Sequence, residues 1–233
     1  MVFEVKVIEI IERTPDVKSF RFSKPSGLEY KPGQFVFIKL RAEEGFMTKH
    51  FTISSSPTEQ GFLEITKKLT GHPYSNALNS LKIGEKVTIV GPKGFFTFQG
   101  EYEKIAMLSG GVGITPLRSI CRYCTDKAIK SDIVLLYGNR RQEDIVFRSE
   151  FDLMQEENKR LRVIHCLEKP PENWKGYVGF LTEEVIRKEI CDFLDRVFYI
   201  CGPPGMLRAM ENTLNTLSVS KEKIKKEIFV GYQ

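Results

Sequence analysis

The sequence of 233 residues lacks a long hydrophobic run, and no apolar segment approaches the ~18 residues that a membrane-spanning helix needs. It also lacks the basic start, apolar stretch and small-residue cleavage site of a signal peptide. The net charge is also small, at +5, because 30 acidic residues nearly balance 35 basic ones. Nucleic-acid binding would require a stronger basic stripe with exposed aromatic residues. We therefore expect a cytoplasmic protein with no membrane span and no nucleic-acid partner.

Cysteine and histidine are few, and their spacing does not suggest a metal site. The five cysteines are an odd number in a chain without a secretory signal, which indicates reduced thiols. Cys121 and Cys124 form a CxxC pair, but they lie in an apolar-periodic stretch that predicts a buried helix face. A second CxxC or a nearby histidine, which would complete a metal site, is missing. The sequence therefore predicts core thiols and no bound metal.

The first hundred residues have the period of β-strands. Short alternating segments are separated by Pro-Gly, Glu-Gly and Ile-Gly turn signals, which favours an antiparallel barrel or sandwich. One short helix is expected around 74–81. The expected strands cover residues 3–7, 17–22, 34–40, 51–54, 62–67 and 86–90.

After about residue 100 the pattern changes to buried strands that alternate with amphipathic helices. This alternation predicts a parallel sheet with helices on both faces. The change of pattern places a boundary near 98–104, so we expect two domains, 1–99 and 100–233. The expected strands cover residues 104–108, 133–137, 161–166, 196–201 and 228–230.

The strongest local signal is the glycine-rich segment 109–116, which directly follows a strand and opens a helix. Glycines let the backbone approach a pyrophosphate, whose charge is met by the helix N-terminus. Thr115 suits the N-cap of that helix and Pro116 its first position. The spacing GxGxxP differs from the usual GxGxxG, and a tight turn without a ligand is the alternative. The strand before and the helix after favour phosphate binding.

Three further segments carry groups of a kind that binds cofactors. Cys201, Gly202 and Pro203 follow a predicted strand, and ligands of open α/β sheets bind outside the carboxyl ends of strands. Taken alone, Cys201 is better interpreted as a small buried core residue. Segment 49–57 offers a cation, an aromatic face and hydroxyls, and segment 71–78 places glycine and serine at the start of the short helix.

Six motifs stand in an order that is typical of one family. They are KHFTISSSP, GHPYSNAL, GPKGFF, LSGGVGITP, YGNRRQED and CGPPGM. In this order they resemble the ferredoxin–NADP⁺ reductase superfamily across nearly the whole chain. In that family an antiparallel β-barrel domain binds the flavin, and an α/β Rossmann-like domain with a parallel sheet binds NAD(P)H. The resemblance therefore implies an FAD-binding β-barrel over 1–99 and an NAD(P)-binding Rossmann-like domain over 100–233.

The resemblance also implies roles for single residues. Phe51 would stack on the isoalloxazine ring, Thr52 would hydrogen-bond near its reactive N5, and Cys201 would border the nicotinamide, so Thr52 and Cys201 are the catalytic candidates. The chain has Lys49 and Phe51 where the family usually has arginine and tyrosine, which keeps the charge and the stacking face. Implied flavin-binding residues are Lys49, His50, Phe51, Thr52, Ile53, Ser54, Ile65, Lys67, Gly71, Ser75, Asn76 and Tyr232. Implied coenzyme-binding residues are Gly110, Gly111, Gly113, Thr115, Pro116, Arg140, Arg141, Cys201, Gly202 and Pro203.

Together these features predict a flavoenzyme that transfers hydride from NAD(P)H to FAD and passes electrons to ferredoxin, flavodoxin or another acceptor. The alternatives are an electron-transfer subunit that works beside a partner subunit, and a non-catalytic nucleotide-sensing module. FAD is favoured over FMN because segment 71–76 supplies a pyrophosphate seat. Arg140 and Arg141 suit the 2′-phosphate of NADPH, while NADH stays open as the co-substrate. No cysteine-rich segment follows the reductase core, so we expect no fused iron–sulfur domain.

Overall fold

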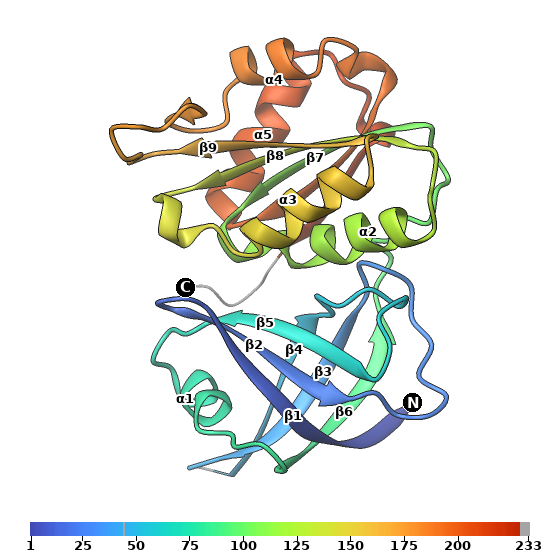
Figure 1. Cartoon of the computed structure of the whole chain (residues 1–233), viewed down its shortest axis with the longest axis vertical. Coiled ribbons are helices and arrows are strands. Elements are labelled where there is room, and N and C mark those ends of the chain that lie inside the picture. The colour runs from blue at the N-terminus through green and yellow to red at the C-terminus, as the bar shows by residue number, and fades with distance from the viewer. Residues whose placement is uncertain (44, 229–233) are drawn as a thin grey trace.

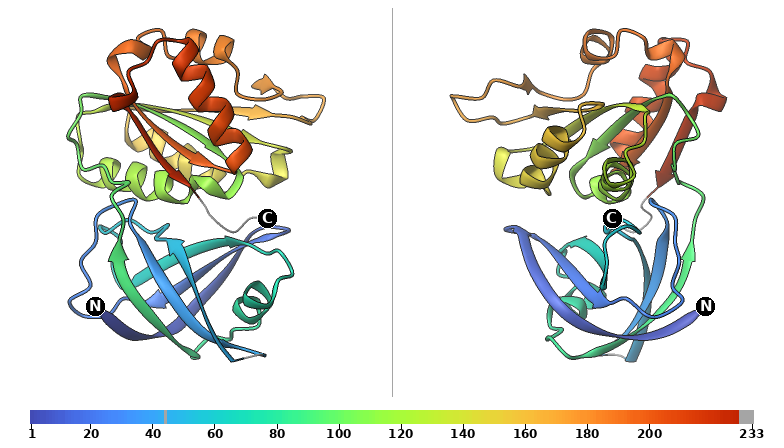
Figure 2. Two further views of the ribbon diagram at one scale, coloured as in Figure 1. Left: turned by 180° about the vertical axis from the view of Figure 1, so that it is seen from behind. Right: turned by 45° about the vertical axis from the view of Figure 1, so that its right-hand side comes forward.

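The computed structural model describes residues 1–43 and 45–228. It contains two six-stranded sheets, one above the other, and the chain passes from the first to the second between Lys93 and Lys104 (Figure 1). The first sheet is antiparallel and the second is parallel and flanked by helices, as two further views show (Figure 2). This confirms the predicted fold class, an antiparallel barrel-like sheet followed by a Rossmann-like parallel sheet.

The antiparallel sheet curls until its two edge strands meet. Its strand order is β4-β3-β6-β1-β2-β5. A β-bridge between Ile53, which directly follows β4, and Ile65 of β5 joins the two edges of the sheet. Alternation places one face of each strand inside, where residues such as Phe20, Ile38 and Leu63 are fully buried. The elements are β1 Val2–Thr14, β2 Val17–Ser23, β3 Phe35–Ala42, β4 Gly45–Thr52, β5 Phe62–Lys68, α1 Pro73–Asn79 and β6 Lys86–Lys93.

The parallel sheet has the strand order β10-β9-β8-β7-β11-β12 and is covered on both faces. Helices α2 and α3 pack on the face that is turned to the barrel, and α4 and α5 pack on the other (Figure 1). The strands are β7 Lys104–Gly110, β8 Asp132–Asn139, β9 Leu161–Leu167, β10 Tyr177–Val178, β11 Val197–Gly202 and β12 Ile224–Ile228. The helices are α2 Ile114–Asp126, α3 Arg148–Glu157, α4 Glu183–Glu189 and α5 Pro204–Thr216.

The two halves share a hydrophobic core. Val17, Phe96 and Phe98 from the barrel side belong to the same buried cluster as α2 and the inner face of the parallel sheet. The hydroxyl of Tyr199 on β11 donates to the carbonyl of Thr97 at 3.0 Å. Cys121 and Cys124 are fully buried in this cluster as free thiols, which confirms their predicted place in the core.

Several element boundaries differ from the sequence prediction. The strand expected over 3–7 runs from Val2 to Thr14, and the strand expected over 228–230 begins at Ile224. The strand expected at 51–54 begins at Gly45, because the polar residues of 48–50 continue the strand along its exposed edge and weaken the apolar signal. The helix after the glycine turn begins at Ile114 with Gly113 as its N-cap, so the predictions of Thr115 as N-cap and of Pro116 as first helical residue were wrong. The Thr115 hydroxyl instead donates to the carbonyl of Val112, since a short 3₁₀ turn over Gly111–Gly113 starts the helical path earlier.

Candidate functional site

A cavity of about 770 Å³ lies at the carboxyl edge of the parallel sheet. The ends of β7, β8 and β11 form one wall of it, and residues from the barrel, Asp16, Val17 and Lys68, form another. Five of the predicted coenzyme residues line the cavity: Gly110, Gly111, Arg140, Arg141 and Pro203. The structure therefore brings both predicted glycine-containing turns and the end of the second Rossmann strand to one crevice between the two halves.

The two turns touch each other through glycines. A Cβ added to Gly113 would lie 2.5 Å from the carbonyl oxygen of Cys201 and from the Cα of Gly202, so only glycine fits there. Gly111 has a φ of +53° and open space around it. The turn that precedes α2 is thus held against the turn that follows β11, and both face the cavity beside the start of a 13-residue helix. Thr115 and Pro116 are buried within the first turn of that helix.

The cavity is also lined by two residues that the sequence analysis did not predict, Asn139 and Phe180. Asn139, the last residue of β8, is 7% exposed, and among the described residues neither atom of its amide has a hydrogen-bond partner. Phe180 lines the same cavity and is 71% exposed. An orphaned amide and an open aromatic ring beside Arg140 are suited to a nucleoside. The position of Asn139 at the end of the second strand was the available signal.

Cys201 is fully buried at the carboxyl end of β11, on the face that is turned to the barrel. The Ser109 hydroxyl donates to its carbonyl at 3.1 Å, which ties β11 to the end of β7. Burial raises the pKa of the thiol well above its usual value, so the group is neutral at physiological pH.

Glu227 on β12 lies beside Cys201 in the strand ladder and was also missed. One of its carboxylate oxygens is buried and finds no hydrogen-bond partner in the described part of the chain. Burial raises the pKa of this carboxyl to about 7. Its burial depends on the neighbouring strand β11, which leaves no signal in the local sequence. Tyr232, predicted to cover the flavin, lies outside the described residues.

We expect Glu227 to make stability fall as the pH rises from about 4.5 to 7. In that window the folded protein keeps the proton on Glu227 while the unfolded chain releases it, so unfolding becomes easier with rising pH. The wild type should lose on the order of 2 kcal/mol relative to Glu227→Gln across this window. Urea unfolding of both proteins at several pH values between 4.5 and 8 measures the difference. Two parallel stability curves would contradict the assignment.

On the barrel side, β4 presents the predicted flavin residues at the open edge of the sheet. Phe51 is buried, and the centroid of its ring lies 5.6 Å from the ring centroid of Tyr74 on α1. The hydroxyl of Thr52 is buried, and no described residue pairs with it. A buried hydroxyl without a partner is a polar group that a bound ligand would satisfy. His50 lies on the outer face with Phe35 and Phe37, on the opposite side of the strand from Phe51.

Positive charge gathers beside this edge. Burial, together with smaller contributions from the charges of Lys49 and Lys68, lowers the pKa of Lys67 to about 8. In the first turn of α1, the hydroxyl of Ser75 accepts from the backbone amide of Thr70 at 3.0 Å, which leaves its own proton able to donate. Lys49 and Lys67 therefore place positive charge beside this edge of the barrel.

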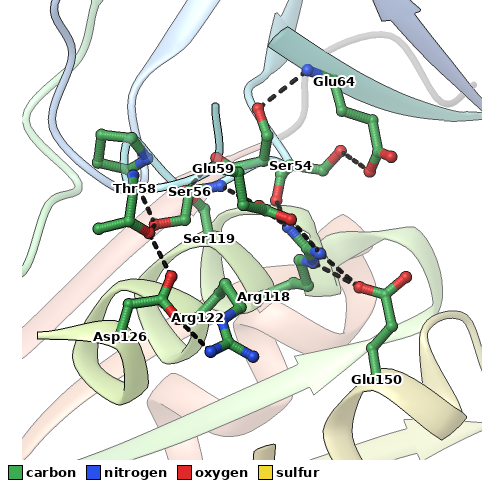
Figure 3. Close-up of polar contacts among 12 residues, drawn as sticks. Ser54, Ser56, Thr58, Glu59, Glu64, Arg118, Ser119, Arg122, Asp126 and Glu150 are labelled. Atoms are coloured by element: carbon green, nitrogen blue, oxygen red, sulfur yellow. Dashed lines mark hydrogen bonds and ion pairs between the residues drawn. The ribbon is translucent and has the colours of Figure 1, made fainter. Parts of the chain in front are cut away.

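The remaining predicted flavin residues have structural contacts. Asn76 donates to the carbonyl of Gly71 at 2.9 Å, which fixes the loop that begins α1. Ile53 and Ile65 are fully buried in the barrel core. The Ser54 hydroxyl donates to Glu64 at 2.9 Å, in the polar cluster between the halves (Figure 3). Strand β5 also contacts the glycine turn 111–113, so the predicted flavin and coenzyme segments meet at the junction.

The fold and this junction define a two-domain dinucleotide-binding protein. Comparison with known proteins is consistent with this class: the model of the oxidoreductase FAD-binding domain matches residues 4–98, and that of the oxidoreductase NAD-binding domain matches residues 107–212. The chain belongs to the ferredoxin–NADP⁺ reductase superfamily, as the order of the motifs predicted. Its two halves are thus an oxidoreductase FAD-binding domain and an oxidoreductase NAD-binding domain.

Two curated relatives and one solved structure illustrate the similarity. The glycine betaine monooxygenase reductase subunit of Pseudomonas aeruginosa (strain UCBPP-PA14) is 32% identical over 97% of this chain and 63% of its own length. NADH-cytochrome b5 reductase 1 of Debaryomyces hansenii is 34% identical over 88% of this chain and 75% of its own length. A ferredoxin–NADP⁺ reductase from Neisseria gonorrhoeae with bound FAD and NADP has the same fold, with a TM-score of 0.84 and 21% identity over 97% of this chain and 98% of that one.

The chain thus spans less than two thirds of the length of the reductase subunit that it matches. Within the residues that the structure describes, no helix is long and apolar enough to cross a membrane.

Proposed function

We propose that the chain accepts hydride from NAD(P)H onto FAD and passes the electrons to an acceptor protein such as ferredoxin, flavodoxin or a partner subunit. The observation that carries this proposal is the cavity in which the glycine turn of the parallel sheet faces the barrel. Bound FAD supplies the redox chemistry, since it takes up two electrons together and releases them singly. The names of the relatives, an oxygenase reductase subunit and a cytochrome reductase, support a protein acceptor.

The residues of the barrel edge suit the flavin. Phe51 offers an apolar face, and Thr52 offers a buried hydroxyl that is free to donate a hydrogen bond. Lys49 and Lys67 supply positive charge for the pyrophosphate of FAD. Gly71, Ser75 and Asn76, at the start of α1, complete the proposed pyrophosphate site. The Ser75 hydroxyl accepts a hydrogen bond from Thr70 and is able to donate one to the phosphate.

The residues of the cavity suit the coenzyme. Gly110, Gly111 and Gly113 let the backbone approach the coenzyme phosphates at the start of α2. At the other end, Asn139 and Phe180 would hold the adenosine, with the amide toward its polar edge and the ring against its face.

NADPH is the proposed coenzyme, because Arg140 and Arg141 line the cavity at the end of β8. Acidic residues stand close by, and Arg141 lies 3.5 Å from Glu143. The 2′-phosphate of NADPH would compete with Glu143 for the guanidinium of Arg141. Comparison of kcat/KM for the two coenzymes tests the preference, and an equal or higher value for NADH would remove it.

Cys201→Ala should slow hydride transfer while the FAD content stays near that of the wild type. The change removes one sulfur atom where β11 ends, and a misplacement of about 1 Å can cost on the order of 100-fold in an oriented reaction. Anaerobic stopped-flow reduction, with a melting curve of both proteins, checks this. A lower melting temperature with an unchanged rate would make Cys201 a structural residue only.

The overall proposal is tested with the purified, flavin-replete protein. We expect a yellow protein whose flavin absorbance bleaches anaerobically on addition of NADPH or NADH. Turnover with added ferredoxin or flavodoxin would support a free-standing reductase, while reduction without turnover on these acceptors would favour a subunit that serves a dedicated partner. A flavin that neither coenzyme reduces would refute the enzyme and favour a nucleotide-sensing module.

A further inference from the structure

Arg118, on the second turn of α2, is a charged residue from the parallel-sheet half that is only 3% exposed (Figure 3). Its guanidinium donates to Glu150 of α3, with Nε 2.8 Å from Oε2. It also donates to both carboxylate oxygens of Glu59, which belongs to the loop after β4, with one of these distances 3.0 Å. A further bond of 3.1 Å reaches the backbone carbonyl of Ser54. One side chain is thus bound by both halves at once.

A second set of bonds returns to the same guanidinium. Glu150 accepts from Arg13 of β1 at 2.6 Å, and Arg13 donates to Glu64 of β5 at 2.9 Å. Glu64 accepts from the Ser54 hydroxyl at 2.9 Å, and the Ser54 carbonyl accepts from Arg118. The five residues form a closed circuit that crosses the junction twice. We call it the junction circuit.

The junction circuit connects the two segments that matter for the proposed reaction. Arg118 follows Thr115 by three residues on the helix that starts at the glycine turn. Ser54 follows Thr52 by two residues at the end of β4. The hydroxyl of Ser119, next to Arg118, donates to the carbonyl of Ser55 at 2.7 Å. The helix of the coenzyme site is therefore bonded directly to the strand of the flavin site.

Stability alone does not explain such a circuit. Buried ion pairs are often no more stabilising than well-packed apolar side chains, although loss of one partner is costly. Burial opposes ionisation of Glu150, but the charges of Arg118 and Arg13 outweigh it and hold its pKa below the usual value. A planar guanidinium with several directed donors fixes orientation as well as distance.

We propose that Arg118 is a positioning residue that sets the orientation of the coenzyme-binding half against the flavin-binding strand. The inference rests on the proposed function, because its consequence is the alignment of the two cofactors. It predicts that loss of the guanidinium slows hydride transfer more than it weakens the binding of either cofactor.

The variants are Arg118→Gln and Arg118→Lys, with Arg196→Gln as the matched control. Arg196 is 5% exposed and lies within the parallel-sheet half, where it is paired with Asp132 and Asp192 and bonded to the carbonyl of Ile105. Both glutamine variants remove a buried guanidinium from an ion-pair network. Only the Arg118 variants remove it from the junction.

The first measurement is anaerobic flavin reduction at saturating coenzyme, with coenzyme affinity and FAD content determined separately. Arg118→Gln should slow reduction by about 10- to 100-fold, with coenzyme affinity within about threefold of the wild type. Arg118→Lys, which keeps the charge and folds if the glutamine variant does not, should lie between. Arg196→Gln should reduce at nearly the wild-type rate. Equal slowing in both glutamine variants, or none in Arg118→Gln, would overturn the proposal.

The second measurement needs neither coenzyme nor activity. Urea unfolding of the flavin-free protein is followed by the fluorescence of Trp174, the only tryptophan, which reports on the parallel-sheet half, and by circular dichroism, which reports on both halves. The two transitions should coincide in the wild type and in Arg196→Gln and separate in both Arg118 variants. Coincident transitions in the Arg118 variants would overturn the proposal. A wild type that no coenzyme reduces would refute the proposed function, and this measurement would still decide whether Arg118 couples the halves.

Discussion

Gly113→Ala is expected to stop flavin reduction by NAD(P)H and to destabilise the protein by about 3 kcal/mol. The added Cβ would lie 2.5 Å from the backbone of Cys201 and Gly202, and neither turn can yield without moving its strand or helix. Because both turns line the proposed coenzyme site, the displacement changes the geometry on which hydride transfer depends. Thermal unfolding and single-turnover reduction of the flavin-replete variant measure the two effects.

Gly111→Ala is the control for this substitution. Its Cβ would meet open space, so only the positive φ of +53° opposes it, at a cost of about 1 kcal/mol. The variant should therefore fold with a smaller loss of stability, and any loss of flavin reduction would come from the added Cβ beside the proposed coenzyme phosphates. If Gly113→Ala were as stable as Gly111→Ala, the close contact between the two turns would not exist in solution.

Thr52→Val is expected to act in opposite directions on stability and on catalysis. In the flavin-free protein the Thr52 side chain is 3% exposed and its hydroxyl has no partner among residues 1–43 and 45–228, so its replacement by a methyl group should stabilise by about 1 kcal/mol. In the proposed holoenzyme the same hydroxyl donates to the flavin, and its loss should slow flavin reduction by about 10- to 100-fold. Urea unfolding of the flavin-free protein and anaerobic stopped-flow reduction test both signs.

Thr66→Val supplies the comparison for Thr52. Thr66 is similarly buried on β5, but its hydroxyl bonds to those of Ser19 and Ser54 at 2.7 and 2.9 Å. Its replacement should destabilise the flavin-free protein, because partners are left unsatisfied. A Thr52→Val variant that is less stable without flavin, and that reduces at the wild-type rate, would show that this hydroxyl has a structural partner and no role toward the flavin.

The architecture could be predicted from the sequence because each half has a distinct hydrophobic period. The glycine turn could be predicted because its residues are contiguous in the chain. The Thr115 cap was mispredicted because the 3₁₀ turn at Gly111–Gly113 depends on contacts with β11. Contacts between distant segments leave no local pattern: Arg118 lies 59 residues from Glu59 in the sequence. Glu227 was missed for the same reason, since its burial depends on the neighbouring strand β11.

The segment between the two sheets, residues 94–103, determines where one half can be exchanged for that of another protein. Phe96 and Phe98 precede the predicted boundary at residue 99, yet their rings pack among residues of the parallel-sheet half, where both contact Tyr199. A chimera that exchanges the second half at residue 100 would leave these two rings on a foreign partner and open holes in the transplanted core. A junction placed before Phe95, which is itself almost completely exposed, would transfer the rings together with the surface that they fill.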